Sequence, residues 1–156
     1  MFFEVCADEN SNFGQVSAEY AGIRVTRVTK DMDWSDPATV DQICAQAEQQ
    51  PGCSAHASLP CPAWSTWQEM AIHKYGAEYI NKLEARRKTL KAMLKSFIRL
   101  AEIILQNGCH ISFEWPKNCC RWLIPELLIL ITTWDLFSVI VHGCPFGCRT
   151  ARVNHY

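Results

Sequence analysis

A cysteine between two prolines is the first feature of the sequence with chemical potential. Cys61 lies in LPCPAWS, directly after a run of small residues that is typical of a buried strand. The rings of Pro60 and Pro62 restrict the backbone on both sides of the thiol. Glu114 follows a second strand-like run, in ISFEWP. Such a pair suits the addition of a thiolate to an electron-poor ring, with an acid beside the ring that stabilises the developing charge.

Other interpretations of the cysteine stay open at this point. Cysteine is among the most buried residue types, and a cysteine at a strand end usually packs in the core. A thiol hydrolase that pairs Cys61 with His56 or His73 is a third hypothesis, although neither histidine has a matching sequence context. The residue types alone do not decide between a nucleophile and a packed turn.

Strand and helix patterns alternate along the chain. Apolar or β-branched runs that are typical of strands cover residues 2–6, 23–29, 53–59, 109–115 and 136–143. Helix patterns lie between them, at residues 13–22, 33–52, 77–106 and 119–134. This alternation predicts one α/β domain over residues 1–148, with a mainly parallel sheet of about five strands and helices on both faces, followed by a short tail at 149–156.

The predicted sheet decides which side chains can meet. In open parallel sheets, ligands bind beyond the carboxyl ends of the strands. The segments expected at that edge are residues 6–12, 29–33, 60–65, 114–116 and 142–147. We therefore expect Cys61 and Glu114 to emerge from the same edge, on neighbouring strands.

Composition limits the class of protein. The 156 residues suffice for one domain with a real core, and 49% hydrophobic with 20% charged residues is typical of a soluble globular protein. The net charge of −1 provides no global attraction to nucleic acids or membranes. The apolar run at 122–141 contains Pro125, Glu126 and Asp135, so we expect no membrane span. Nine cysteines without framework spacing, after a start without secretory-signal features, predict free thiols in an intracellular protein.

Two further clusters have ordinary explanations. Residues 82–99 contain seven basic residues against one acid, Glu84. Such a helix face can track phosphates, but a solvated face is the commoner reason for it. The apolar face of this helix, which we expect in the core, consists of Leu83, Leu90, Leu94, Phe97, Ala101 and Ile104. A zinc site would draw on Cys119, Cys120, His142, Cys144 and Cys148. Their spacing matches zinc knuckles poorly, so we expect no metal.

Taken in order, the motifs resemble those of the DNA cytosine-C5 methyltransferases. LPCPAWS resembles the segment in which a Pro-Cys after one strand supplies the nucleophile. ISFEWP resembles the segment whose glutamate contacts the flipped cytosine. The resemblance is closest to a divergent branch found in retrotransposon-type polyproteins, to which DLFSVIVHGCPFG is also similar. It extends from FFEVCADENSNFGQ to Gly147.

The resemblance implies a Rossmann-like core that binds S-adenosylmethionine. Cys61 would attack C6 of a flipped cytosine and Glu114 would hydrogen-bond N3, before methyl transfer to C5. The residues implied at the cofactor are Ala7, Asp8, Asn12, Phe13, Gly14, Asp33 and Pro60. The implied partner is DNA, with RNA as the alternative, and the implied compartment is the nucleus if the substrate is DNA.

The chain also departs from the family pattern. Gly14 is the only glycine of its cofactor loop, and no acidic residue follows the second strand until Asp31. The chain stops where the family's target-recognition region would begin, so we expect an incomplete core. These departures leave a second class of function open. In that case the domain is a non-catalytic Rossmann-like fragment of a mobile-element polyprotein, and at most a nucleic-acid-binding or structural module.

Overall fold

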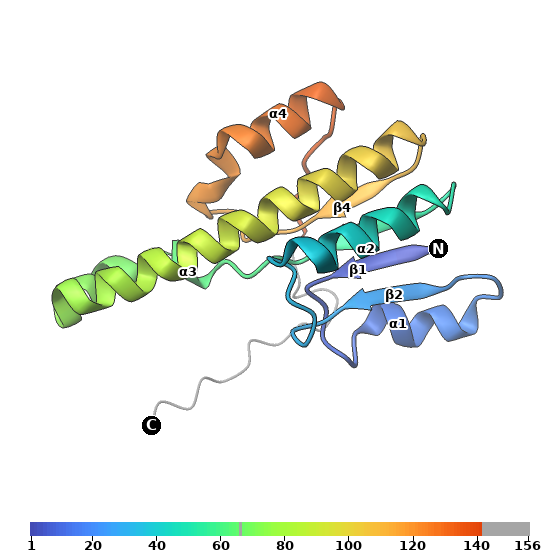
Figure 1. Ribbon diagram of the computed structural model, residues 1–156. Helices are drawn as coiled ribbons and strands as arrows, with labels where there is room; N and C mark the ends of the chain where they lie inside the picture. Colours follow the sequence, from blue (N-terminus) through green and yellow to red (C-terminus); the bar gives the residue numbers. More distant parts are fainter. Residues whose placement is uncertain (66, 142–156) are drawn as a thin grey trace.

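The computed structural model describes residues 1–65 and 67–141. These residues form four strands: β1 (Phe2–Val5), β2 (Val25–Val28), β3 (Ser54–Ala57) and β4 (Ile111–Phe113). The α-helices between and after them are α1 (Asn12–Val16), α2 (Pro37–Glu48), α3 (Trp67–Gln106) and α4 (Pro125–Thr133). Short 3-10 turns complete the set: η1 (Ser17–Glu19), η2 (Pro62–Trp64) and η3 (Cys120–Leu123). Figure 1 shows the strands side by side, with α2 and α3 lying across them.

The four strands form one parallel sheet in the order β2-β1-β3-β4. Val5 lies opposite both Val28 and Ala57, and Ala57 lies opposite Phe113. The carboxyl ends of all four strands therefore meet at one edge. The prediction of an α/β fold with a parallel sheet is confirmed, and the arrangement is compatible with a Rossmann-like core.

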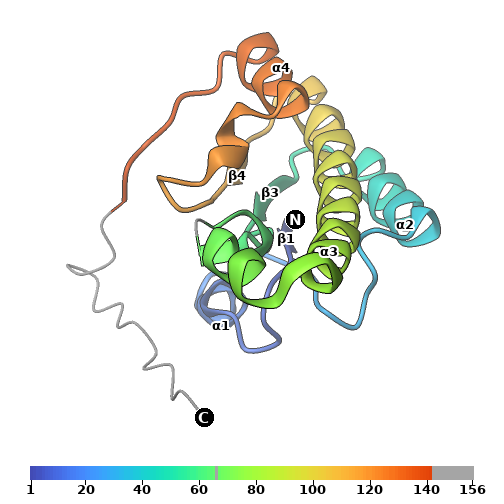
Figure 2. The same ribbon diagram turned by 90° about the vertical axis from the view of Figure 1, so that its left-hand side faces the viewer.

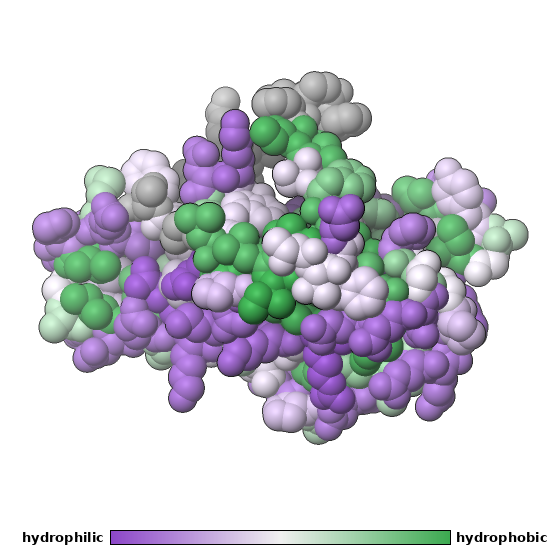
Figure 3. Space-filling model, turned by 90° about the horizontal axis from the view of Figure 1, so that it is seen from above, coloured by the Kyte–Doolittle hydropathy of each residue, from purple (hydrophilic) through white to green (hydrophobic). Residues whose placement is uncertain are grey.

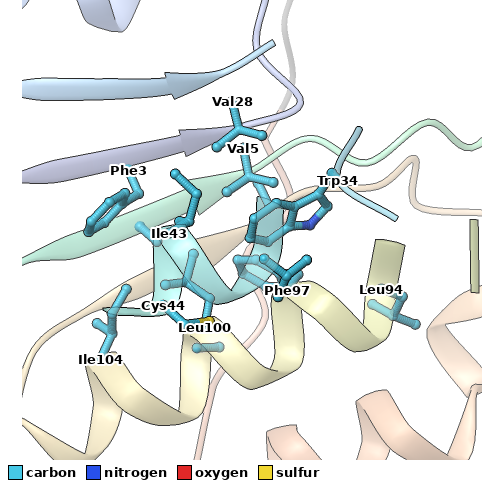
Figure 4. Close-up of a cluster of buried hydrophobic side chains, with 14 of the residues drawn as sticks. Phe3, Val5, Val28, Trp34, Ile43, Cys44, Leu94, Phe97, Leu100 and Ile104 are labelled. Atoms are coloured by element: carbon cyan, nitrogen blue, oxygen red, sulfur yellow. The ribbon is translucent and has the colours of Figure 1, made fainter. Parts of the chain in front are cut away.

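The two faces of the sheet differ in chemistry, because successive side chains of a strand point to opposite faces. The first face is apolar and packs against α2 and α3 around Phe3, Val5 and Phe97 (Figure 4). The second face carries a polar row in register across the strands: Arg27, Glu4, His56 and Ser112. Figure 2 shows α2 and α3 on one side of the strands and α1 on the other. Helices thus flank both faces as predicted, but only the five-residue α1 flanks the polar one among the described elements.

Local sequence features explain where α2 begins and where the path of α3 is interrupted. Asp36 caps α2, because its carboxylate accepts a hydrogen bond from the backbone N–H of Thr39 at 3.0 Å, and Pro37 starts the first turn. The predicted helix at 77–106 is present and follows Gly76, whose φ of 67° interrupts the helical path. α3 also includes a helical stretch before that glycine, which the sequence analysis does not predict. Within the described residues, no helix is both long and apolar enough to cross a bilayer.

The fifth predicted strand differs from the structure. Residues 136–141, the described part of the predicted 136–143, form no strand. Asp135 has a φ of 49°, and the N–H of Leu136 bonds back to the carbonyl of Ile131 at 2.9 Å, which closes the end of α4. A β-branched run becomes a strand only where a neighbouring strand pairs with it, because strand propensity depends on context. The predicted strand end at 142–147, the tail at 149–156 and the zinc candidates His142, Cys144 and Cys148 lie outside the described residues.

Large apolar side chains are exposed in the last part of the described chain: Leu123, Leu128, Ile129, Phe137, Val139, Ile140 and Val141. Figure 3 shows hydrophobic residues gathered on the face seen from above, beside a band of hydrophilic residues on the side where α2 and α3 lie. In contrast, the predicted core face of α3 is buried at every position except Leu90, which is half-buried. The prediction that the apolar face of α3 packs in the core is therefore confirmed.

Truncation of Phe97 tests the core on which the sheet depends. This side chain is fully buried and its ring stacks on Phe113 of β4 at 5.4 Å between centroids. We expect Phe97→Ala to lower the free energy of unfolding by about 3 to 5 kcal/mol in urea denaturation. The exposed Glu102 on the same helix is the control, and Glu102→Ala should change stability by less than about 0.5 kcal/mol. Similar urea midpoints of unfolding for Phe97→Ala and Glu102→Ala would contradict the burial of Phe97 in the core.

Candidate functional site

Two loops leave the carboxyl ends of β3 and β4 and are bound to each other. The N–H of Glu114 donates to the carbonyl of Ala57 at 3.0 Å, which extends the strand pairing past β4. The indole Nε1 of Trp115 donates to the carbonyl of Leu59 at 2.8 Å. The hydroxyl of Ser58 donates to Oε1 of Glu114 at 2.5 Å. The loops that carry the predicted thiol and carboxyl group therefore lie together at one edge of the sheet.

Cys61 stands at the start of η2, and its side chain is half-buried. Its carbonyl accepts a hydrogen bond from the N–H of Trp64 at 2.9 Å, which fixes the turn. The thiol packs against a small apolar cluster, which we name the loop cluster: Ala63, Trp64, Leu83 and Cys119. Trp115 packs against the same cluster, and the neighbouring Glu114 is exposed. The structure thus puts Cys61 and Glu114 on adjacent loops of one edge, with neither side chain sealed in the core.

A chain of hydrogen bonds crosses from β4 to β3 and ends on Glu114. Ser58 donates its only hydroxyl proton to Glu114, so Ser58 must accept from Nε2 of His56 at 3.2 Å, which then carries the imidazole proton. In the neutral ring, Nδ1 of His56 accepts from the hydroxyl of Ser112 at 2.7 Å. We name these four residues the Glu114 relay. Oε2 of Glu114 has no hydrogen-bond partner among the described residues, and the residue as a whole is exposed.

The relay was not predicted from the sequence, in which His56 appears only as a partner of Cys61 in the thiol-hydrolase hypothesis. Its signal is the pair of patterns His-x-Ser on β3 and Ser-x-Glu on β4, at 56–58 and 112–114. Residues two apart on a strand share a face, and the register sets His56 opposite Ser112. Only the register between the strands, which is a tertiary property, shows that the two patterns meet.

The predicted cofactor residues fall into two groups. A cavity of about 280 Å³ lies at the carboxyl ends of β1 and β2 and is lined by Cys6, Ala7, Asp8, Glu9, Thr29 and Lys30. Of the residues predicted at the cofactor, Ala7 and Asp8 line this cavity. The remaining predicted residues are not part of this lining: Asn12, Phe13, Gly14, Asp33 and Pro60. Phe13 instead packs on the polar face, with its ring 5.3 Å from that of His56.

Asp33 has a structural role before α2. Its Oδ1 accepts hydrogen bonds from the N–H of Ser35 at 2.9 Å and from the hydroxyl of Ser35 at 2.6 Å. The hydroxyl contact first, and the backbone contact next, lower the pKa of Asp33 from its ordinary value. The carboxylate therefore stabilises the turn that leads into α2, and it stays ionised at neutral pH.

Gly14 makes room for a protein side chain. A Cβ at Gly14 would lie 1.4 Å from Nη2 of Arg27. Arg27 donates from Nη1 to the carbonyl of Glu9 at 2.9 Å, and its Nε lies 3.8 Å from the buried carboxylate of Glu4. Ser11 donates to the same carboxylate at 2.5 Å. The space beside the only glycine of the loop is filled by the guanidinium group.

The residues at this edge fit S-adenosylmethionine only in part. Ligand pockets for molecules of that size are typically about 300 to 1,000 Å³, and this cavity is slightly smaller. Its carboxylates, Asp8 and Glu9, suit hydroxyl and ammonium groups of a ligand, but Arg27 fills the space beside Gly14, where the resemblance puts the cofactor. The whole cofactor would therefore require Arg27 to move.

No cluster of three or more His, Cys, Asp or Glu side chains suited to a metal ion occurs within residues 1–65 and 67–141. In the same part of the chain, six cysteines are free thiols: Cys6, Cys44, Cys53, Cys61, Cys109 and Cys119. Comparisons with protein-family models, with curated proteins and with solved structures found no match. The resemblance seen in the sequence therefore remains a hypothesis, and any function must be argued from the geometry of the site.

Gly14 and Arg27 can be tested as a coupled pair. We expect Gly14→Ala to displace the guanidinium group and to lower the free energy of unfolding by about 1 to 3 kcal/mol, because Glu4 then loses a buried partner. In an Arg27→Ala background the same substitution should be neutral or stabilising, since alanine favours a helix over glycine by about 1 kcal/mol. Urea denaturation of the four proteins measures the coupling, and additive effects would contradict the contact.

Cys6 should resist alkylation in the folded protein. It follows β1 with a φ of 60°, and burial raises the pKa of its thiol from 9.0 to about 12. At pH 8 only about one thiol in ten thousand is then the reactive thiolate. We expect iodoacetamide to leave Cys6 unmodified in the native chain and to modify it in urea, as measured by peptide mass spectrometry. Equal rates in both states would show that the pKa of this half-buried thiol is not raised in the folded protein.

Proposed function

We propose that this chain engages a cytosine of DNA as the DNA cytosine-C5 methyltransferases do, with Cys61 as nucleophile and Glu114 as the group that holds the base. RNA is the alternative substrate. The single observation that supports the proposal is the pair of hydrogen bonds, Ser58 to Glu114 and Trp115 to Leu59, that binds the two loops together. The proposal implies an intracellular chain, in the nucleus if DNA is the substrate.

The chain's own residues account for the addition step. As the thiolate of Cys61 forms a bond to C6, the C5–C6 double bond of cytosine breaks and its electron pair moves towards C5 and the N3 side of the ring. Glu114 in its protonated form donates from Oε2 to N3 and balances that charge, while Oε1 keeps its bond from Ser58. Pro60 and Pro62 hold the sulfur in place while the bond forms.

S-adenosylmethionine would supply the methyl group for C5 of the adduct. Ala7 and Asp8 would lie against that cofactor at the ends of β1 and β2. Because Arg27 fills the space beside Gly14, the chemistry that the chain's own residues support stops at the covalent adduct. The same arginine supports the alternative function, a Rossmann-like module that binds nucleic acid without catalysis.

Two modified oligonucleotides separate addition from methyl transfer. A 5-azacytosine oligonucleotide accepts a thiolate at C6 without the cofactor, whereas 5-fluorocytosine retains the enzyme only after a methyl group has been added at C5. We expect the first to give a covalent adduct with the full chain, detected by intact mass. An adduct with the second in the presence of S-adenosylmethionine would show that the chain also transfers the methyl group. Cys61→Ser should abolish both adducts, and Glu114→Gln should slow their formation about a hundredfold.

The matched control is Cys109→Ser, because Cys109 is also half-buried but precedes β4, at the opposite edge of the sheet. This variant should form adducts at the rate of the unmodified chain. An adduct with 5-azacytosine alone would support the addition step and favour loss of the cofactor function. No adduct with either probe would refute the enzyme and leave the non-catalytic module.

A further inference from the structure

A second cavity lies away from the strand-end site. It has a volume of about 600 Å³ and separates the middle of α3 from the segment that leads through η3 into α4. Its charged lining consists of Lys88, Lys91, Lys95, Arg121 and Glu126. We name it the lysine cleft. Four cations around one carboxylate make its local charge strongly positive, although the whole chain has a net charge of −1.

The three lysines form a row on one side of α3. Positions 88, 91 and 95 are three and four residues apart, the spacing that brings helical side chains next to one another. Among the described residues, Lys88, Lys91 and Lys95 form no ion pair, whereas other basic residues of the same helix do: Lys82, Arg87 and Arg99. These three lysines therefore keep their positive charge unpaired by the carboxylates of the described residues.

The opposite wall adds to this positive potential. α4 begins there, with Ile124 at its N-cap and Pro125 in the first turn, and no side chain caps it. The first N–H groups of a helix and its dipole favour an anion. Arg121 is positioned by Trp64, since its guanidinium carbon lies 3.1 Å from the centre of the indole ring. Both walls of the cleft thus favour negative charge.

We propose that the lysine cleft binds the phosphodiester backbone of a nucleic-acid strand. The row from Lys88 to Lys95 extends about 10 Å along the helix axis, which suits successive phosphates better than a single anion. Trp64, which contacts Arg121, lies three residues after Cys61, so one wall of the cleft is in contact with the loop of the proposed site. The choice of nucleic acid as the ligand rests on the proposed function. The preference of the cleft for an extended anion rests only on its charge and shape.

The test compares two triple variants of the full chain that lose the same charge. Lys88, Lys91 and Lys95 are changed to Gln in the first, and Lys74, Lys82 and Arg86, which lie outside the cleft on the same helix, are changed to Gln in the control. Fluorescence anisotropy with a labelled single-stranded oligonucleotide is measured between about 50 and 200 mM salt. Circular dichroism checks that both variants keep their helices, as substitutions of exposed side chains should allow.

The expected result is specific to the cleft. Loss of three phosphate contacts should reduce the slope of log K against log salt concentration by about 2, and weaken binding at least about tenfold at low salt, whereas the control triple should keep the original slope. Equal losses in both variants, no binding by the unmodified chain, or equal competition by inorganic phosphate at matched charge would overturn the inference.

Failure of the cleft proposal and failure of the proposed function give different results in these experiments. Binding that depends on the three lysines, in a chain that forms no Cys61 adduct, would refute the enzyme and support the cleft. If the Lys→Gln triple forms the Cys61 adduct at an unchanged rate and binds the oligonucleotide with unchanged affinity, the role of the cleft is refuted and the enzyme is supported. The anisotropy experiment is run without S-adenosylmethionine, and the control variant Cys109→Ser should bind the oligonucleotide like the unmodified chain.

Discussion

The parallel pairing of β3 with β4 is the constraint on which the rest of the structure depends. Parallel neighbours cannot be joined by a tight turn, so the chain must cross back over the sheet before the second strand begins. α3 makes that crossing, and it packs against the sheet through Phe97 and Ile104. The small side chains of Ala55 and Ala57 belong to the same core and leave volume for these larger ones. Without this crossing, the loops after the two strands would have no reason to meet.

The polar face of the sheet explains why a glycine stands at position 14, in the first turn of α1. Glu4 is buried there, and a buried carboxylate is stable only when it is hydrogen-bonded or paired. Ser11 and Arg27 supply those partners. Arg27 then occupies the space beside the first turn of α1, and any side chain at position 14 would have to displace its guanidinium group, which accounts for Gly14. One buried charge on β1 therefore determines a residue on β2 and another on α1.

Local patterns predicted what depends on local physics. The buried face of α3 and the strands at the ends of which Cys61 and Glu114 lie follow from residue type and spacing, and the structure has them. The run at 136–141 has the composition of a strand, but composition cannot supply a partner strand. The Glu114 relay was missed for a related reason, because it depends on the register between His56 and Ser112.

Trp64 connects the two functional regions physically. Its ring centre lies 4.7 Å from the guanidinium carbon of Arg87 and 3.1 Å from that of Arg121, so one indole holds two cations whose mutual repulsion it offsets. Arg87 also donates to the carbonyl of Ala63, which ties α3 to η2. Charges attract a ligand only within about 10 Å at ordinary salt. Because Trp64 belongs to η2, the turn that positions Cys61 also holds Arg121 in the wall of the lysine cleft. A movement of that turn would change the position of the thiol and the electrostatic attraction of the cleft together.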